Sequence, residues 1–253
     1  MYMRLVQTKV KPDGLAMMKE YYDTNIIPAL QQTAGCLYAC LMRSARQSDE
    51  IISMTLWETQ LRADAYEKSG SFHQLLDGAK PFLADSSEWK IQLTKEMTLE
   101  YAPVPEEPTV SSYAISATSD ANTQSPGEQA PDTYLRLVSV KLRPGILDEY
   151  KRLYESEIIP ALQATKGCRH AYLTIPNSQG NEAISITIWD RKIDAEAYER
   201  SGLFAQLLEK TKHLYSDLFQ WKMHLDHQHS GQSATSEDMQ VQGYSVVTGK
   251  SFQ

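Results

Sequence analysis

The chain has 253 residues, of which 42% are hydrophobic and 23% are charged, a balance typical of folded domains. A net charge of −7 without any cluster of Lys and Arg argues against a nucleic-acid partner, because such partners bind through phosphate neutralisation. No apolar run approaches the ~20 residues that span a bilayer, and the first residues lack the apolar core of a signal peptide. Three cysteines make no disulfide framework. We therefore expect a cytoplasmic protein without nucleic-acid or membrane partners.

The chain contains one long segment twice. The motif IIPALQQTAGC at Ile26–Cys36 recurs as IIPALQATKGC at Ile158–Cys168. The segment Tyr2–Leu93 aligns with Tyr134–Leu225 without gaps, and roughly 40 of about 92 positions are identical. A unit of this length that recurs whole is a domain rather than a solenoid repeat. We therefore predict domains at residues 1–95 and 133–226, a linker at 96–132 and a flexible tail at 227–253.

Each repeat is predicted to fold in the order βαββαβ. The predicted strands are Met3–Val10 and Leu135–Leu142, Cys36–Arg43 and Cys168–Ile175, Ile51–Trp57 and Ala183–Trp189, and Glu88–Leu93 and Gln220–Leu225. The predicted helices are Asp13–Thr33 and Gly145–Thr165, followed by Arg62–Leu83 and Asp194–Leu214, which Ser-Gly pairs at 69–70 and 201–202 break. This order is that of a ferredoxin-like unit. The predicted class is α+β, with two antiparallel sheets packed as a barrel-like pseudo-dimer and the helices outside.

Two prolines and two glycines mark corresponding points in the first helices. Pro28 and Pro160 should kink or restart each helix, because proline lacks a backbone N–H and disfavours helical conformation in the residue before it. Gly35 and Gly167 should end the segment and turn the chain into the second strand. The repeats differ just past this point, where the first repeat has Leu37-Tyr38 and the second has Arg169-His170 at the equivalent positions. If the two repeats have different functions, we expect the difference to lie there.

Short strand candidates also lie in the linker and in the tail. They are Val110–Ile115 and Val241–Val247, each rich in β-formers and each with a Tyr three residues after a Val. Both follow a loose connection, so each could pair with a sheet edge in its own half or in a neighbouring chain. We expect a homodimer of the pseudo-dimeric chain through these fifth strands.

Strand alternation divides the polar residues from the apolar ones. The apolar set of the third strands is expected to face the helices: Ile52, Met54, Leu56, Ile184, Ile186 and Ile188. The opposite set is expected between the sheets: Ser53, Thr55, Trp57, Ser185, Thr187 and Trp189. Tyr38, His170, Tyr172 and His224 of other strands share this second side. The pattern fits a polar ligand-binding interior, and it also fits an interface filled by these side chains alone.

Four motifs occur in both repeats. They are the first strand ending in KP or RP, the PAL…G turn, the strand-three Trp before an acidic residue, and AYE-x-SG-x-F at Ala65–Phe72 and Ala197–Phe204. With these motifs the chain resembles the antibiotic biosynthesis monooxygenase family of dimeric α/β barrels, over both repeats. Members are usually homodimers, and this chain resembles two of them fused. Some members bind ligands between sheet and helices, so either cavity stays open as a site.

The resemblance implies a set of functional residues. The quinol-forming branch uses the strand-three Trp and an Asn four residues before it, which implies catalytic roles for Trp57, Trp189, Ser53 and Ser185. The resemblance also implies substrate-binding roles for Tyr66 and Tyr198, whose helix caps the ligand pocket in the family. Strand alternation adds Tyr38, His170, Tyr172 and His224 as candidate substrate-binding residues, and Arg4 and Arg136 are candidates to bind a ligand anion. The haem-degrading branch is disfavoured, because Leu76 stands in the place of its histidine. A Ser offers one hydrogen-bond donor where an Asn amide offers two.

Structural explanations compete with these roles. Each Trp could be a core residue at the end of a strand, and Tyr66 could pack its helix onto the sheet. Arg4 and Arg136 lie on the helix-facing side of the first strands, where an ion pair with Glu67 or Glu199 would account for them.

The resemblance implies a cofactor-independent monooxygenase, with neither metal nor cofactor, that acts on a small aromatic or quinol-type molecule. In such chemistry the deprotonated substrate itself reduces O₂, while the protein orients it and stabilises its charge. The alternative is a non-catalytic small-ligand-binding or stress-related barrel protein.

Overall fold

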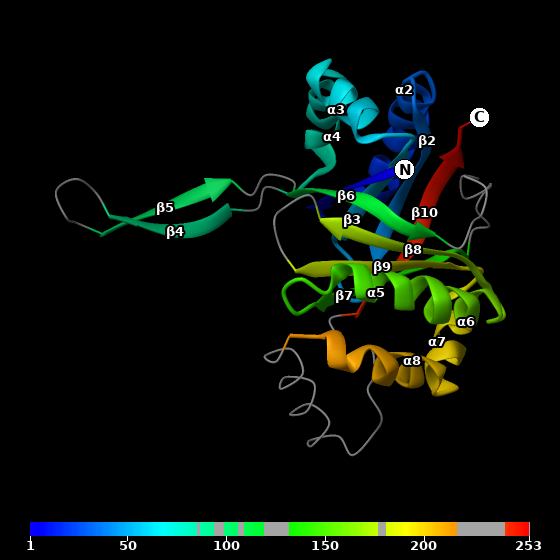
Figure 1. The fold of residues 1–253 in the computed structure, drawn as a ribbon. Coiled ribbons are helices and arrows are strands. Elements are labelled where there is room, and N and C mark those ends of the chain that lie inside the picture. The colour runs from blue at the N-terminus through cyan, green and yellow to red at the C-terminus, as the bar shows by residue number, and fades with distance from the viewer. Residues whose placement is uncertain are drawn as a thin grey trace.

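The computed structural model describes residues 1–84, 87–93, 99–105, 109–118, 132–176, 181–216 and 241–252. Eight strands form one closed barrel in the order β1-β3-β2-β10-β7-β9-β8-β6 (Figure 1). Their bounds are β1 Tyr2–Lys9, β2 Cys36–Ser44, β3 Glu50–Trp57, β6 Thr109–Thr118, β7 Tyr134–Lys141, β8 Cys168–Pro176, β9 Glu182–Trp189 and β10 Val241–Ser251. A separate two-stranded sheet consists of β4 (Ser87–Leu93) and β5 (Leu99–Pro105).

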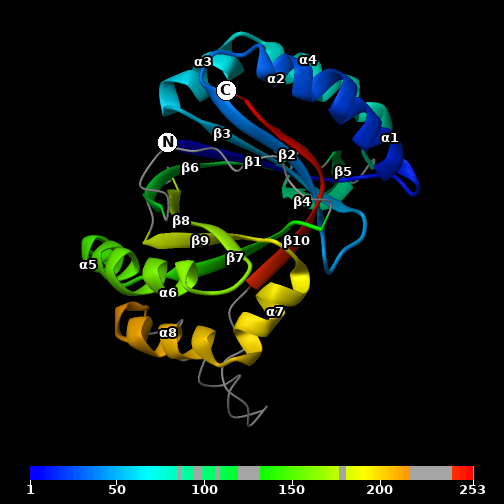
Figure 2. The ribbon, with the colours of Figure 1, turned by 90° about the vertical axis from the view of Figure 1, so that its right-hand side faces the viewer.

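The helices cover two opposite sides of the barrel (Figure 2). Those of the first repeat are α1 Gly14–Tyr21, α2 Ile27–Gln31, α3 Gln60–Lys68 and α4 Ser71–Ala79, and those of the second are α5 Leu147–Leu153, α6 Ile159–Gln163, α7 Lys192–Arg200 and α8 Leu203–Thr211. Short 3₁₀ turns follow at Lys80–Phe82 and Lys212–Leu214. Among the helices of the described ranges, none is long and apolar enough to cross a membrane. The predicted α+β class and barrel-like pseudo-dimer are confirmed.

The fourth strand of the predicted unit is not the one that completes the sheet. Glu88–Leu93 does form β4, but β4 pairs only with β5, in a hairpin that extends away from the barrel (Figure 1). The place beside β1 is taken by β6, which contains the candidate strand Val110–Ile115. The physical reason is closure: β6 also pairs with β8 of the second repeat, so no barrel edge stays unpaired. Gln220–Leu225 lies outside the described residues.

The strand candidate in the tail has the corresponding role. β10 pairs with β7 of its own repeat and with β2 of the first repeat. Both candidate strands therefore exist, and each joins the two repeats within one chain. Both edges of β6 and both edges of β10 are hydrogen-bonded within the barrel, so neither strand offers a free edge to a second copy of the chain. The expected homodimer through these strands has no such edge to use.

The barrel interior is filled by apolar side chains, which reverses our assignment for the third strands. Ile52, Met54 and Leu56 lie inside the barrel, in one cluster with Met3, Leu5 and their neighbours. Ser53, Thr55 and Trp57 face the helices instead. An eight-stranded barrel is just wide enough for side chains to fill it, so its inner face takes the apolar set. The third-strand residues that we expected to line a polar interior, such as Ser53 and Thr55, therefore lie under the helices.

The first helix of each repeat contains a wide π-helical turn before its proline. The turns are Tyr22–Ile26 and Tyr154–Ile158, and α2 and α6 begin directly after them. The predicted restart at Pro28 and Pro160 is thus confirmed, in the form of a turn that absorbs the missing N–H without breaking the helix. Gly35 (φ +82°) and Gly167 (φ +84°) end these segments in left-handed conformation, as predicted.

Candidate functional site

The larger cavity of the chain lies between the helices and the sheet of the first repeat. It has about 660 Å³ of empty space, counting its mouth. Its polar lining residues are Arg4, Thr8, Tyr22, Ser53, Thr55 and Tyr66. The rest of the described lining is apolar, from Met18 and Leu30 to Phe72 and Leu83.

Arg4 brings a buried positive charge to this cavity. The residue is 3% exposed, at the centre of β1, and its Cζ atom lies 5.1 Å from the centre of the Phe72 ring. Arg4 Nη2 lies 3.1 Å from Glu67 Oε2, so the predicted ion pair is confirmed. That contact is not aligned as a hydrogen bond, and neither Nη1 nor Nη2 has a hydrogen-bond acceptor among the described residues. The wall of the cavity therefore contains a charged guanidinium whose terminal nitrogens make no hydrogen bond among the described residues.

A second donor in the cavity is the hydroxyl pair of Tyr22 and Ser53. Tyr22 starts the π-helical turn, and its hydroxyl oxygen lies 3.0 Å from Ser53 Oγ of β3. Burial raises the pKa of Tyr22 well above its ordinary value, so the phenol keeps its proton. Two hydroxyl protons and one mutual hydrogen bond leave one proton for a ligand oxygen. Val6 pairs with Ser53 and Arg4 with Thr55, so both donors project from adjacent strands.

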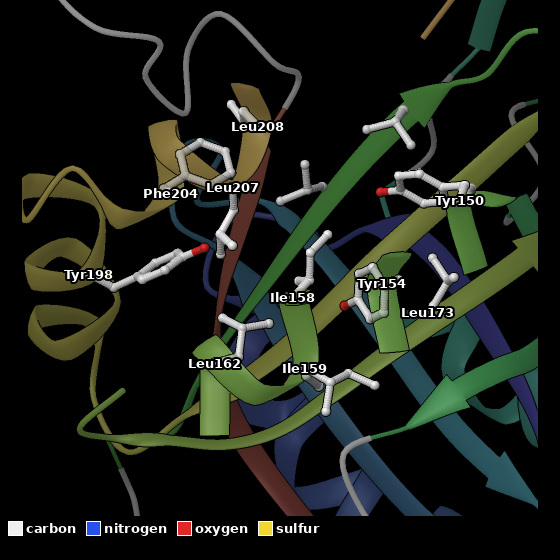
Figure 3. Close-up of a cluster of buried hydrophobic side chains, with 14 of the residues drawn as sticks. Tyr150, Tyr154, Ile158, Ile159, Leu162, Leu173, Tyr198, Phe204, Leu207 and Leu208 are labelled. Atoms are coloured by element: carbon white, nitrogen blue, oxygen red, sulfur yellow. The ribbon is translucent and has the colours of Figure 1, made fainter. Parts of the chain in front are cut away.

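The equivalent cavity of the second repeat is smaller, at about 420 Å³. Tyr150 stands where the first repeat has Met18, and Tyr215 stands where it has Leu83. Both tyrosines are buried, their ring centres lie 6.4 Å apart, and the Tyr215 hydroxyl is 2.5 Å from Thr211 Oγ1. Figure 3 shows Tyr150 and Tyr154 projecting from one helical segment toward the same core. These rings fill the volume that stays open in the first repeat.

Six of the predicted site residues line the two cavities. They are Arg4, Ser53 and Tyr66 in the first repeat and Arg136, Ser185 and Tyr198 in the second. In the second repeat the Ser185 hydroxyl pairs with Tyr154 at 2.7 Å. Arg136 Cζ lies 4.1 Å from the Phe204 ring centre and 5.7 Å from that of Tyr198, so two rings cover its guanidinium. Arg136 also lies close enough to Glu199 for the two charges to interact.

The two tryptophans lie behind the cavity walls rather than in them. Trp57 is fully buried, its Nε1 donates to Thr55 Oγ1 at 2.9 Å, and its ring packs 5.2 Å from that of Tyr66. Trp189 repeats this arrangement, with a 2.8 Å bond from Nε1 to Thr187 Oγ1. Neither tryptophan is among the residues that line the two cavities, which agrees with the explanation that each is a core residue at the end of a strand. The indole N–H groups are already bonded, and the cavity surface is formed by the residues in front of them.

Three further predicted residues, Tyr38, His170 and Tyr172, are not among the residues that line the two cavities. Tyr38 and Tyr172 lie inside the barrel, as predicted for their side of the second strands. His170 stacks on Tyr172, with the ring centres 6.1 Å apart and the planes at 12°. His224 lies outside the described residues. The difference Leu37-Tyr38 against Arg169-His170 is thus not a difference between the two cavities.

The described lining of the larger cavity has no His, Asp, Glu or Cys. Cys36 and Cys168 start the second strands and Cys40 lies in the barrel, and burial raises the pKa of each thiol to about 12. Thiolate chemistry is therefore disfavoured at neutral pH. Among the residues that the structure describes, no three His, Cys, Asp or Glu side chains gather as metal ligands would.

Sequence reasoning missed Tyr22, Met18 and Leu83. Tyr22 occurs in both repeats at helical spacing, which is the pattern of an ordinary core residue. The exchanges of Met18 for Tyr150 and Leu83 for Tyr215 are visible on comparing the repeats. They acquire meaning only when the fold shows that both positions face one cavity.

Comparisons with known proteins agree with this architecture. A candidate monooxygenase of Fusobacterium nucleatum subsp. nucleatum is 10% identical, with a TM-score of 0.67 over 99% of this chain and 94% of that chain. A second, of Lactobacillus acidophilus, is 7% identical, with a TM-score of 0.65 over 99% and 95%. An anthrone oxidase-like protein is 13% identical, with a TM-score of 0.54 over 99% and 92%. At such identities these likenesses show the fold.

The sequence itself places the first repeat in a family. Residues 1–77 match the model of the antibiotic biosynthesis monooxygenase family. The chain matches none of the curated proteins. The matched segment runs from β1 through α3 and contains most of α4, and it supplies Arg4, Tyr22, Ser53 and Tyr66. The first repeat of this chain therefore matches the antibiotic biosynthesis monooxygenase family model over residues 1–77, and it is closed into one barrel with a second copy of its own fold.

Proposed function

We propose that the chain is a cofactor-independent monooxygenase that acts on a small aromatic or quinol-type molecule in the cavity of the first repeat. One observation carries the proposal. The wall of a mainly apolar cavity, with about 660 Å³ of empty space counting its mouth, contains the buried guanidinium of Arg4 and one hydroxyl proton of the Tyr22–Ser53 pair that is not used in their mutual hydrogen bond. A flat aromatic body suits the apolar lining, and its oxygen substituents suit the two donors. The first repeat matches the antibiotic biosynthesis monooxygenase family model, and its cysteines Cys36 and Cys40 are free and buried. Both features fit a cytoplasmic oxidoreductase.

The donors suit the charge that such a reaction develops. A quinol in the cavity would place an oxygen near Arg4, whose positive charge favours the ionised form of the substrate. The proton leaves to solvent through the mouth of the cavity, since the described lining offers no side-chain base. The electron-rich anion then reduces O₂. One oxygen atom replaces a ring hydrogen, the other leaves as water, and the ring supplies all four electrons and ends as a quinone.

The same lining favours a second candidate, a non-catalytic binding protein. Without a carboxylate or imidazole in the described lining, proton removal depends on the substrate's own acidity and on Arg4. A protein that only binds aromatic molecules needs no base at all. Ligand binding without oxygen uptake would identify this second function.

Oxygen uptake with a panel of hydroquinones and naphthohydroquinones tests the proposal. We expect uptake by the wild-type chain above the autoxidation rate, with the ring-hydroxylated quinone as product. Ser53→Ala should lower the rate about ten- to a hundredfold, because the Tyr22 hydroxyl loses the partner that orients its proton toward the developing charge. The matched variant Ser185→Ala should leave the rate unchanged. No uptake with any member of the panel, or equal losses in both variants, would contradict it.

A further inference from the structure

The most unusual group in the molecule is the guanidinium of Arg4. It is buried, it lines the larger cavity, and its terminal nitrogens lack a hydrogen-bond acceptor among the described residues. Buried charged donors normally have hydrogen-bond acceptors, because leaving such a donor without an acceptor costs more free energy than an ordinary hydrogen bond contributes. The Phe72 ring beneath the guanidinium fixes its position. The group is thus held in place at the cavity wall, with its terminal nitrogens buried and without a hydrogen bond among the described residues.

Glu67 does not use up this charge. Its carboxylate contacts one side of Arg4, but the Glu67 side chain is 50% exposed, so water screens the pair. The hydrogen-bonding capacity of the two terminal guanidinium nitrogens is left unused among the described residues. A carboxylate or phenolate oxygen is the natural acceptor there, since charge-assisted bonds are the strongest that arginine makes.

The second repeat shows what the same position looks like when it is closed. Two aromatic rings, those of Phe204 and Tyr198, lie within cation–π distance of Arg136. Tyr150 and Tyr215 line the same cavity, at the positions where the first repeat has Met18 and Leu83. The two halves have kept the fold and diverged in the space beside the arginine.

We propose that the first cavity is a site for an aromatic anion, in which Arg4 binds one ionised oxygen group, phenolate or carboxylate, of a flat apolar molecule. The second cavity takes no such ligand, so the chain binds one molecule. This inference rests on the proposed function, because it names the ligand class of the same cavity. It does not require that the ligand react with oxygen.

Isothermal titration of the full-length chain with three probes tests this proposal. The probes are 2-naphthoate, its neutral isostere 2-naphthamide, and 2,4-dinitrophenol, which is ionised at neutral pH. We expect one site per chain and a preference for naphthoate over the amide of roughly tenfold or more. Binding of the dinitrophenolate as well would assign phenolates and carboxylates alike, whereas binding of naphthoate alone restricts the site to carboxylates.

Matched variants locate the charge. Arg4→Gln should abolish the preference for naphthoate, and Arg136→Gln should leave it unchanged. Glu67→Gln leaves Arg4 in place and removes its competing carboxylate, so it should tighten naphthoate binding severalfold. If Arg4→Gln does not fold, Glu67→Gln decides alone, and unchanged or weaker binding in it overturns the proposal.

Three other outcomes overturn the proposal. They are equal affinity for naphthoate and naphthamide in the wild type, loss of the preference in Arg136→Gln, and two equivalent sites per chain. The result is separable from the oxygenase proposal. Naphthoate binding through Arg4 without oxygen uptake supports the anion site and contradicts the oxygenase proposal. Oxygen uptake that survives Arg4→Gln supports the oxygenase proposal and contradicts the anion site.

Discussion

A chain shortened to residues 1–240 is expected to lose the cooperative fold of the barrel. The deletion removes β10, which pairs with β2 along one edge and with β7 along the other. It also removes Tyr244, Val246 and Phe252, all buried. Two strand edges would then be unpaired beside an apolar interior, and domains of this size are stable by only about 5–15 kcal/mol. We expect aggregation, or a loss of several kcal/mol in the free energy of unfolding.

Chemical denaturation and size-exclusion chromatography measure this loss. Gly249→Val is a milder variant, because a Cβ atom at Gly249 would lie 2.6 Å from Cys40 Cβ and push β10 away from β2. Lys250→Ala, at an exposed position of the same strand, is the control and should keep the wild-type midpoint. A monomeric 1–240 chain with the wild-type midpoint would show that β10 does not close the barrel.

Replacing either buried tryptophan by alanine is expected to destabilise the chain by about 3–5 kcal/mol. Trp57 and Trp189 are both fully buried, and each indole N–H donates to a threonine hydroxyl of its own strand. The variants Trp57→Ala and Trp189→Ala would leave a large cavity between sheet and helices. Urea denaturation followed by circular dichroism measures the effect, which should be similar in the two repeats.

Trp57→Phe separates a structural role from a catalytic one. This variant keeps most of the buried volume and loses the bond to Thr55, at a cost of about 1–2 kcal/mol. Oxygen uptake by its folded fraction should therefore equal that of the wild type. If the variant has full stability but no uptake, Trp57 contacts the substrate and our placement of it behind the cavity wall is wrong.

The local parts of the fold could be predicted from the sequence. The repeat predicted two equivalent units, the proline and glycine positions predicted where the first helices change and end, and Gly70 and Gly202 predicted the break in the second helices. These features depend on the conformational limits of single residues. They hold whatever the rest of the chain does.

Long-range pairing could not be predicted in the same way. Glu88–Leu93 and Val110–Ile115 both have the composition of strands, and nothing local says which one pairs with β1. Alternation separated Ser53 from Ile52, but it cannot say which face is the inside of a closed barrel. That choice depends on closure, which is a property of eight strands together.

The site was partly predictable for a related reason. Arg4 is conspicuous because a charge on the helix-facing side of a strand needs a partner, and that reasoning identified Glu67. Tyr22 is not conspicuous, because an aromatic residue at helical spacing resembles any core residue. Its role comes from the π-helical turn that aims its hydroxyl at Ser53.

The central claim is that the cavity of the first repeat is the working site, and exchanging the residues that close or open the two cavities tests it most directly. The measurement is oxygen uptake with the quinol that the wild-type chain consumes fastest. Met18→Tyr with Leu83→Tyr gives the first cavity the tyrosines of the second, and Tyr150→Met with Tyr215→Leu does the opposite. We predict that the first double variant loses at least about tenfold in rate while remaining folded, and that the second keeps the wild-type rate. Full uptake with the first cavity filled, or loss of uptake only when the second is altered, would contradict the claim.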